Sequence, residues 1–253
     1  MSVAGVVVAH GPEPELVGCI AALAPQVDEL VLVANAVNGI PSLPNGTRTL
    51  WIERPQGFAA NANRGIAETT AEFVVVANTD AIPAPDAVQK LHAFASSIPR
   101  CGIAGPELRY PDGSWQPSRR RFPTVAKTMI RRPPLRFVFD PERWQRSHYL
   151  LDDRSSLPIQ ADWMMGAFLL MRRKMLEELG GFDEGFRLYG EDIDLCYRAA
   201  KAGWERWFVP QALVRHTYAA VIDHRFLTRR TLWHWRSMAH FARKHPERLR
   251  SLL

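Results

Sequence analysis

Glu72-Phe-Val-Val-Val-Ala-Asn-Thr-Asp80 is the stretch that decides the expected fold. Its apolar run is not interrupted by polar side chains, which is typical of a strand buried on both faces of a sheet. The run Val3–Ala9 has the same character, and we expect two further strands at Glu29–Ala34 and Thr49–Glu53. The sequence therefore predicts a buried sheet, with polar residues such as Asp80 just past a strand end.

Helices are predicted between these strands. Apolar residues at helical spacing indicate a helix over Glu13–Leu23 and another over Asp86–Ser96, and we expect a third at Asn61–Thr69. This alternation predicts an α/β fold with a mostly parallel central sheet flanked by helices. Later in the chain we expect further strands and helices at Phe168–Arg172, Arg173–Leu179, residues 191–202, Trp204–Val209, Leu213–His216 and Thr228–Lys244.

Length and composition narrow the class of protein. The 253 residues suffice for one large domain or two small ones. No apolar run approaches the roughly 20 residues that span a bilayer, and the first residues lack the positive charge of a signal peptide. The three cysteines, Cys19, Cys101 and Cys196, are scattered and form no CxxC pair. This usage predicts a reducing, cytoplasmic environment.

The net charge of +6 is unevenly distributed. Residues 117–147 carry nine Lys and Arg against two acids, and residues 221–253 carry eight against two. Such segments suit an anionic surface, whether phospholipid, diphosphate or nucleic acid, although a solvated surface is the simpler interpretation. The part of the chain from Arg119 to Leu157 is rich in Arg, Pro and aromatic residues without a regular period, and predicts a long excursion from the sheet.

Three places carry residues suited to chemistry. Asp80 follows a buried strand, where a carboxylate is able to hold a divalent metal against a diphosphate, although a turn residue is the more common role. His216 is a candidate metal ligand or a hydrogen-bonded interior residue. Glu191, Asp192 and Asp194 stand at the start of a predicted helix, where the free N–H groups favour an ionised carboxylate. Asp192 is the candidate general base, with helix capping as the alternative.

The run Gly57-Phe-Ala-Ala-Asn-Ala-Asn-Arg-Gly65 brings small residues to the start of a helix. Glycine allows backbone to approach a ligand closely. The run fits neither GxGxxG nor the Walker pattern. This counts against a dinucleotide-dependent dehydrogenase and against a P-loop NTPase.

In their order and spacing, these segments resemble the family 2 (GT-A fold) glycosyltransferases, particularly the bacterial rhamnosyltransferase-like branch. The resemblance covers residues 3 to about 216, and Phe241-Ala-Arg-Lys-His245 in the tail also looks like this branch. The matching pieces are Val6–His10, Gly57–Ile66, Val76–Ala81, Gly105–Ser114, Asp162–Ala167, Gly181–Arg198 and Val209–His216.

The resemblance implies an inverting transfer of a sugar from a nucleotide diphosphate to an acceptor hydroxyl. Asp80 would bind Mg²⁺ or Mn²⁺, His216 would complete the metal site, and Asp192 would deprotonate the acceptor. Acceptor contacts would come from Trp163, Gly166 and Glu191. Donor contacts would come from Ala9, His10, Asn35, Gly57, Asn61, Asn78, Thr79 and Asp80.

The same resemblance implies a glycosyltransferase domain over residues 1–216 and a basic helical tail over residues 217–253. Residues 1–106 would bind the nucleotide sugar and residues 107–216 the acceptor. Two positions depart from the usual family pattern. Ala34 stands where an acidic residue normally precedes Asn35, and Asn78 replaces the first acid of the DxD-type element. The donor is expected to be a dTDP- or UDP-sugar, with rhamnose as the leading sugar.

The expected acceptor is a glycan or a lipid-linked glycan at the cytoplasmic face of the membrane. Trp233, Trp235 and Phe241 in the basic tail predict a peripheral membrane contact, and a tail that only packs on the core is the alternative. A catalytically silent sugar-nucleotide-binding module is the rival function. Nucleic acid is not an expected partner, because the acids at 191–194 and the lack of a recognised motif oppose it.

Overall fold

The computed structural model describes residues 2–11, 13–35, 40, 42–44, 46–122, 146, 150–187, 189–217 and 229–250. Most of the predicted excursion, residues 123–145 and 147–149, lies outside these described residues, as does the start of the tail at 218–228.

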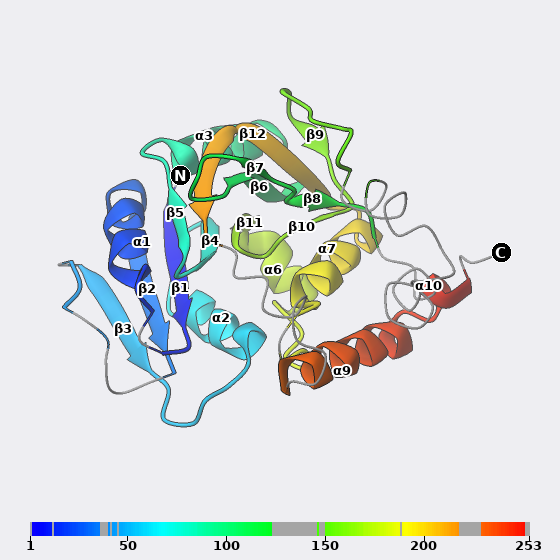
Figure 1. Cartoon of the computed structure of the whole chain (residues 1–253), viewed down its shortest axis with the longest axis horizontal. Coiled ribbons are helices and arrows are strands. Elements are labelled where there is room, and N and C mark those ends of the chain that lie inside the picture. The colour runs from blue at the N-terminus through cyan, green and yellow to red at the C-terminus, as the bar shows by residue number, and fades with distance from the viewer. Residues whose placement is uncertain are drawn as a thin grey trace.

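A single large sheet forms the centre of the molecule (Figure 1). Within the described residues it has ten strands, with the order β3-β2-β1-β4-β11-β6-β12-β5 and with β7 and β9 paired to β6 and β12. A separate pair, β8 and β10, forms a two-stranded sheet. The strands are β1 Val3–Ala9, β2 Glu29–Ala34, β3 Thr47–Trp51, β4 Phe73–Asn78, β5 Ala81–Pro83, β6 Cys101–Arg109, β7 Trp115–Gln116, β8 Arg119–Arg120, β9 Ile159–Gln160, β10 Trp163–Met164, β11 Phe168–Arg172 and β12 Glu205–His216.

Strand directions confirm the predicted mostly parallel sheet, with β11 inserted antiparallel and the short strands β5, β7 and β9 also paired antiparallel. β1 pairs in parallel with β2 and β4, β2 with β3, and β12 with β6. β11 lies between β4 and β6 and is antiparallel to both. Because the carboxyl ends of β1, β2 and β4 lie at one edge, the residues that follow these strands are brought together there.

Helices cover both faces of the sheet and create two cores. One core places Val7, Leu32 and Val75 against α1 and α3, and the other places residues of opposite strand parity against α2, α6 and α7. Alternate side chains of one buried strand thus enter different cores, which explains the uninterrupted apolar runs. The helices are α1 Leu16–Leu23, α2 Phe58–Ala67, α3 Ala87–Ser97, α6 Arg173–Leu179, α7 Glu191–Lys201, α9 Arg229–Lys244 and α10 Glu247–Arg250, with a 3-10 turn at Ala24–Gln26.

Several element boundaries differ from those expected: α1 begins at Leu16 and not at Glu13, and β3 spans Thr47–Trp51 and not Thr49–Glu53. α2 begins at Phe58 and not at Asn61, so the small-residue run forms the helix itself. Gly65 allows this helix to lie on the sheet, because a Cβ there would come 2.3 Å from a methyl group of Val6. The two extended pieces predicted at 204–216 are one strand, β12, whose pairing with β6 shifts register between Val209 and Leu213. The irregularity accommodates the proline at residue 210 without ending the strand.

The tail helix α9 packs beside α7 (Figure 1). Its buried residues are Ser237 and Phe241, and His245 directly after the helix is also buried. Leu232 and Trp235, by contrast, remain 52% and 39% exposed. Among the described residues, no helix is long and apolar enough to span a bilayer.

Candidate functional site

The two predicted metal ligands meet at the ends of β4 and β12. Asp80 follows β4, His216 ends β12, and the Nε2 atom of His216 lies 3.4 Å from Oδ1 of Asp80. The other ring nitrogen, Nδ1, is 2.9 Å from Oε1 of the buried Gln116. When Nδ1 donates its proton to that amide oxygen, the lone pair of Nε2 faces the Asp80 carboxylate. Two lone-pair donors facing each other suit a shared cation.

A second acidic side chain, Glu13, which the sequence interpretation missed, lies beside this pair. Glu13 follows β1, and its Oε2 accepts a 2.5 Å hydrogen bond from the Thr79 hydroxyl. Burial raises the pKa of Glu13, and the charge of Asp80 acts in the same direction. Glu13 had been interpreted only as the start of a helix, although its position after a strand end was the clue to a site residue.

Asn35 organises the neighbouring end of β2. Its Nδ2 lies 2.7 Å from Nδ1 of His10 and donates to the Gln56 carbonyl at 3.2 Å. Its Oδ1 accepts from the Gln56 backbone N–H at 3.3 Å. Two predicted donor residues, His10 and Asn35, are therefore in direct contact. Gln56 joins them through its backbone, which gave no clue in the sequence.

The remaining predicted donor residues differ in what they offer a ligand. Asn61 is fully buried on α2, and both polar atoms of its amide lack a hydrogen-bond partner among the described residues. Gly57 is the N-cap of α2 and lies close to the backbone of Arg187. A Cβ at residue 57 would come 2.7 Å from the Arg187 carbonyl oxygen. The side chain of Ala9 is fully buried in the core, and its carbonyl accepts from the Asn35 N–H. Ala9 therefore supports Asn35 and presents no side chain to a ligand.

Asp192 lies in the first turn of α7, held by backbone N–H groups. Its Oδ2 accepts from Gly166 at 3.0 Å and its Oδ1 from Ile193 at 2.8 Å. The carbonyl of Ala167, the residue after Gly166, accepts a hydrogen bond from the N–H of Asn78 at 2.9 Å. A short path of hydrogen bonds and chain thus connects Asp192 to the end of β4, the same end that carries Asp80.

Glu191 and Asp192 form a close acidic pair with unequal surroundings. Burial raises the pKa of both, and the charge of Asp192 raises the pKa of Glu191 further. Asp192 has two N–H donors that stabilise its ionised form, whereas Oε2 of Glu191 is buried with no partner among the described residues. We therefore assign the proton to Glu191 and the negative charge to Asp192.

Trp163, a predicted acceptor residue, is only 4% exposed and belongs to the core. Its ring nitrogen donates to the Arg121 carbonyl at 2.9 Å. Its ring lies under the Arg120 guanidinium, whose positive charge lowers the pKa of Asp192. Trp163 therefore reaches the site through Arg120, a residue that the sequence interpretation did not single out. The other predicted acceptor residue outside α7, Gly166, contacts Asp192 directly.

Asp194, two residues along α7 from Asp192, has an entirely different environment. It is fully buried and accepts from Arg198 at 2.6 Å, from Lys244 at 3.0 Å and from His245 at 2.8 Å. Three basic side chains therefore surround it, two of them from the tail. Asp194 therefore holds α9 and the residue after it to α7.

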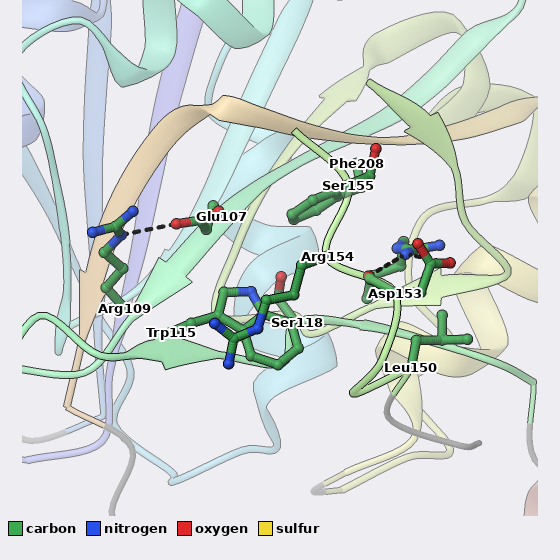
Figure 2. A pocket seen from close by; sticks show the side chains of 10 residues that line it. Glu107, Arg109, Trp115, Ser118, Leu150, Asp153, Arg154, Ser155 and Phe208 are labelled. Carbon is green, nitrogen blue, oxygen red and sulfur yellow. Dashed lines mark hydrogen bonds and ion pairs between the residues drawn. The ribbon is translucent and has the colours of Figure 1, made fainter. Parts of the chain in front are cut away.

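A separate pocket of about 230 Å³ is lined by residues of β6, β7, β8 and β12 and by residues 150 and 153–155 (Figure 2). None of the predicted site residues lines it. Arg119 pairs with Asp153 across it, and the Arg154 guanidinium stacks 4.7 Å from the Trp115 ring. These contacts fasten residues 150–155 to the strands β7 and β8. The neighbour of Trp115 on β7 is Gln116, so this strand contributes one residue to the pocket and the next to the contact with His216.

The described side chains offer few metal ligands in one place. Among residues in the described part of the chain, no group of three or more His, Cys, Asp or Glu side chains could hold an ion. Asp80 and His216 form a pair. A divalent ion there would need its other ligands from a bound diphosphate and water, which are oxygen donors that Mg²⁺ and Mn²⁺ accept.

Sequence comparisons connect this chain with known enzymes. The family model described as "Glycosyltransferase like family 2" matches residues 6–237. The N-acetylglucosaminyl-diphospho-decaprenol L-rhamnosyltransferase of Mycobacterium tuberculosis is 33% identical over 237 residues, covering 83% of this chain and 74% of that protein. Rhamnosyltransferase WbbL of Escherichia coli is 38% identical over 84 residues, which is 33% of this chain and 31% of that protein.

Solved structures show the same fold at low sequence identity. GalNAc-T7, solved with UDP, GalNAc and Mn²⁺, superposes with a TM-score of 0.65 at 18% identity, over 86% of this chain and 44% of that chain. Residues 1–349 of TarS from S. aureus superpose with a TM-score of 0.54 at 13% identity, over 86% and 60%. These likenesses confirm the predicted GT-A fold. The match over most of the chain and the 33% identity to a named rhamnosyltransferase make this protein a glycosyltransferase of family 2.

Proposed function

We propose that this enzyme transfers a sugar, with inversion, from a dTDP- or UDP-sugar to a hydroxyl of a lipid-linked glycan. Rhamnose is the leading sugar, because two relatives are named rhamnosyltransferases. A lipid-linked acceptor is favoured because the M. tuberculosis relative is named for N-acetylglucosaminyl-diphospho-decaprenol. The observation that carries the proposal is the hydrogen-bonded path from Asp192 through Gly166 and Ala167 to the end of β4.

Asp192 acts as the general base in this proposal. Its carboxylate takes the proton of the acceptor hydroxyl while that oxygen forms a bond to the anomeric carbon. The bond from that carbon to the diphosphate oxygen breaks, and its electron pair leaves with the diphosphate. A single displacement inverts the configuration, so no nucleophilic carboxylate is needed. The raised pKa of Asp192 strengthens it as a base.

Glu191 is proposed to remain protonated beside this base. Its buried and unpartnered Oε2 is able to donate a hydrogen bond to an acceptor oxygen. A second negative charge next to Asp192 would be disfavoured by burial and by repulsion. The pair therefore divides the work, with Asp192 accepting the proton and Glu191 orienting the acceptor.

Asp80 and His216 would hold Mg²⁺ or Mn²⁺ against the donor diphosphate. Such an ion would neutralise the charge that develops on the leaving group. Gln116 fixes the ring of His216, and Thr79, held by Glu13, fixes the turn that carries Asp80. His10, Asn35 and the buried amide of Asn61 are the proposed donor contacts on the neighbouring strand ends.

The central test replaces Asp192 by Asn, which keeps the shape but removes the base. We expect turnover to fall about a thousandfold, with binding of UDP or dTDP in the presence of Mn²⁺ unchanged. Asp152→Asn, an exposed carboxylate paired with Arg146, is the matched control. Turnover that survives Asp192→Asn would exclude Asp192 as the base.

A thermal-shift panel of nucleotide sugars identifies the donor and tests the metal site. The correct donor stabilises the protein by mass action, and Mn²⁺ should increase that stabilisation. Asp80→Asn should remove the Mn²⁺-dependent increment, whereas Asp86→Asn, an exposed carboxylate paired with Lys90, should retain it. An increment that persists in Asp80→Asn would place the metal elsewhere.

We also propose that the exposed face of α9 contacts the membrane that carries the acceptor. Leu232 and Trp235 are exposed there, next to the exposed Arg236. Flotation with vesicles of anionic phospholipid should weaken in the double variant Leu232→Ser, Trp235→Ser. Trp51→Ser on β3, where Trp51 is 48% exposed, is the control. Point variants are used because α9 is packed into the fold and its deletion would disturb the core. Equal flotation of the wild type, the double variant and the control would refute the contact.

A further inference from the structure

A group of charged side chains joins the tail to the loop before α7. Nζ of Lys244 lies 2.6 Å from Oδ2 of Asp183, and Nε2 of His240 lies 3.0 Å from the same oxygen. Burial alone would raise the pKa of Asp183, but the hydrogen bonds from Lys244 and His240 outweigh it, so the pKa is lowered. Asp183 is therefore an ionised anchor for the tail.

The same helix end also reaches α7 itself. Lys244 lies 3.0 Å from the Asp194 carboxylate, and Nε2 of His245 lies 2.8 Å from its Oδ1. Asp194 is fully buried and His245 is 4% exposed, so water does not replace these contacts. A buried carboxylate is costly without partners, which makes the position of Asp194 strongly dependent on the tail.

The first turn of α7 lacks the usual means of fixing a helix start. Its N-cap, Gly190, has φ +97° and provides no side-chain hydrogen bond. The preceding Tyr189 has φ +65°, a left-handed conformation that is unfavourable for a side-chain-bearing residue. Besides the hydrogen bonds that Asp192 accepts, the contacts of Asp194 hold this turn. Asp194, whose N–H donates to the Gly190 carbonyl at 2.9 Å, lies within this turn.

From these contacts we infer that Lys244 and His245 are positioning residues for the site, holding the first turn of α7 through Asp194. Their contacts keep Glu191 and Asp192 facing Gly166, although neither tail residue contacts the substrate. The inference rests on the proposed function for the role of Asp192, whereas the structural hold itself does not depend on it. Phe241 would pack α9 against the fold without these two residues. The inference therefore gives Lys244 and His245 a separate role.

The loop before α7 also connects the tail with α2, in the proposed donor-binding half. Arg187 accepts at its carbonyl from the N–H of Phe58, the first residue of α2, at 3.4 Å. Its guanidinium stacks 4.9 Å from the ring of Trp233 on α9. The tail thus contacts both the loop at the donor half and the helix that carries the proposed base.

The test uses single substitutions in the full chain. Lys244→Met and His245→Leu remove the two contacts, and His245→Gln restores a donor that can reach Oδ1 of Asp194. Lys174→Met, at an exposed lysine of α6, is the matched control. Hydrogen exchange of the amides at 190–196 is measured first, followed by kcat and donor KM with the donor from the thermal-shift panel.

In Lys244→Met and His245→Leu we expect faster exchange at 190–196 and a kcat lowered about tenfold to a hundredfold, with donor KM unchanged. His245→Gln should recover most of both losses, and Lys174→Met should match the wild type. Unchanged exchange in His245→Leu, or lower thermal stability with a wild-type kcat, would overturn the inference. Exchange is independent of turnover, so a wild-type protein without transferase activity would refute only the proposed function.

Discussion

Asp192 and Asp194 stand two residues apart on α7 and face opposite environments. Asp192 faces the sheet side and is held by two backbone N–H groups, with Arg120 as the nearby cation that lowers its pKa. Asp194 faces the tail and is fully buried among Arg198, Lys244 and His245. Backbone N–H groups position a carboxylate without forming an ion pair with it. Three basic side chains form ion pairs with Asp194, which gives it a structural role.

The comparison explains how one acidic run serves two purposes. A helical turn directs neighbouring residues to different faces, so each carboxylate meets a different part of the protein. Lys244 and His245 of the tail neutralise Asp194, whereas Asp192, the proposed base, lies next to Glu191, whose pKa is raised by burial. Three substitutions test this division.

The largest effect on stability is expected from Asp194→Asn. The substitution leaves three basic side chains without their carboxylate, and we expect unfolding to become easier by about 3 kcal/mol. Urea denaturation of the variant and the wild type measures this difference. Asp192→Asn should not reduce stability in the same experiment, because it removes a desolvated charge. Equal losses in the two variants would contradict the division.

A smaller effect, which depends on pH, is expected from Glu191→Gln. The pKa of Glu191 is raised in the folded state above its ordinary value of 4.5. Below that value both states are protonated, and as pH rises the unfolded state loses its proton first, so wild-type stability falls through this window. The variant lacks this loss, and by neutral pH its stability relative to wild type should have improved by about 1 to 2 kcal/mol.

Urea denaturation at several pH values would reveal the change in slope. A parallel pH dependence in the wild type and in Glu191→Gln would show that Glu191 is ionised in the folded protein, and would assign the shared proton to Asp192.

The smallest effect is expected from Arg120→Met. Its guanidinium lowers the pKa of Asp192, so its removal should raise that pKa and move the acidic limb of kcat/KM to higher pH by about half a unit. Arg121→Met, the next residue in the chain, is the control. A limb that does not move would show that the base is screened from Arg120 by solvent.

Much of the fold could be predicted from the chain alone. The buried strands, β11 and α6 lie where the apolar patterns placed them, because burial on both faces leaves a continuous apolar run. The antiparallel placement of β11 between β4 and β6 could not be predicted, since pairing partners are set by long-range contacts. The start of α2 was placed three residues late, because the small residues of the run gave no boundary.

The site was only partly predictable. Asp80, His216 and Asp192 were singled out by their positions after strands or at a helix start, and the structure brings Asp80 and His216 together. Their roles remain predictions until the variants are measured. Glu13, Gln116 and Arg120 were missed because each acts through a residue distant in sequence. The packing of α9 was left open by the sequence, since it depends on charged contacts that apolar spacing does not reveal.

The sequence by itself determined which residues form the sheet, where its strands end, and that carboxylates stand at those ends and at the start of α7. Tertiary structure alone decided which carboxylate meets backbone N–H groups and which meets lysine and histidine. The physical reason is that patterning is local, whereas the charge state of a buried group depends on every element packed around it. For Asp192 and Asp194, those elements are β10–β11 on one side and the tail on the other.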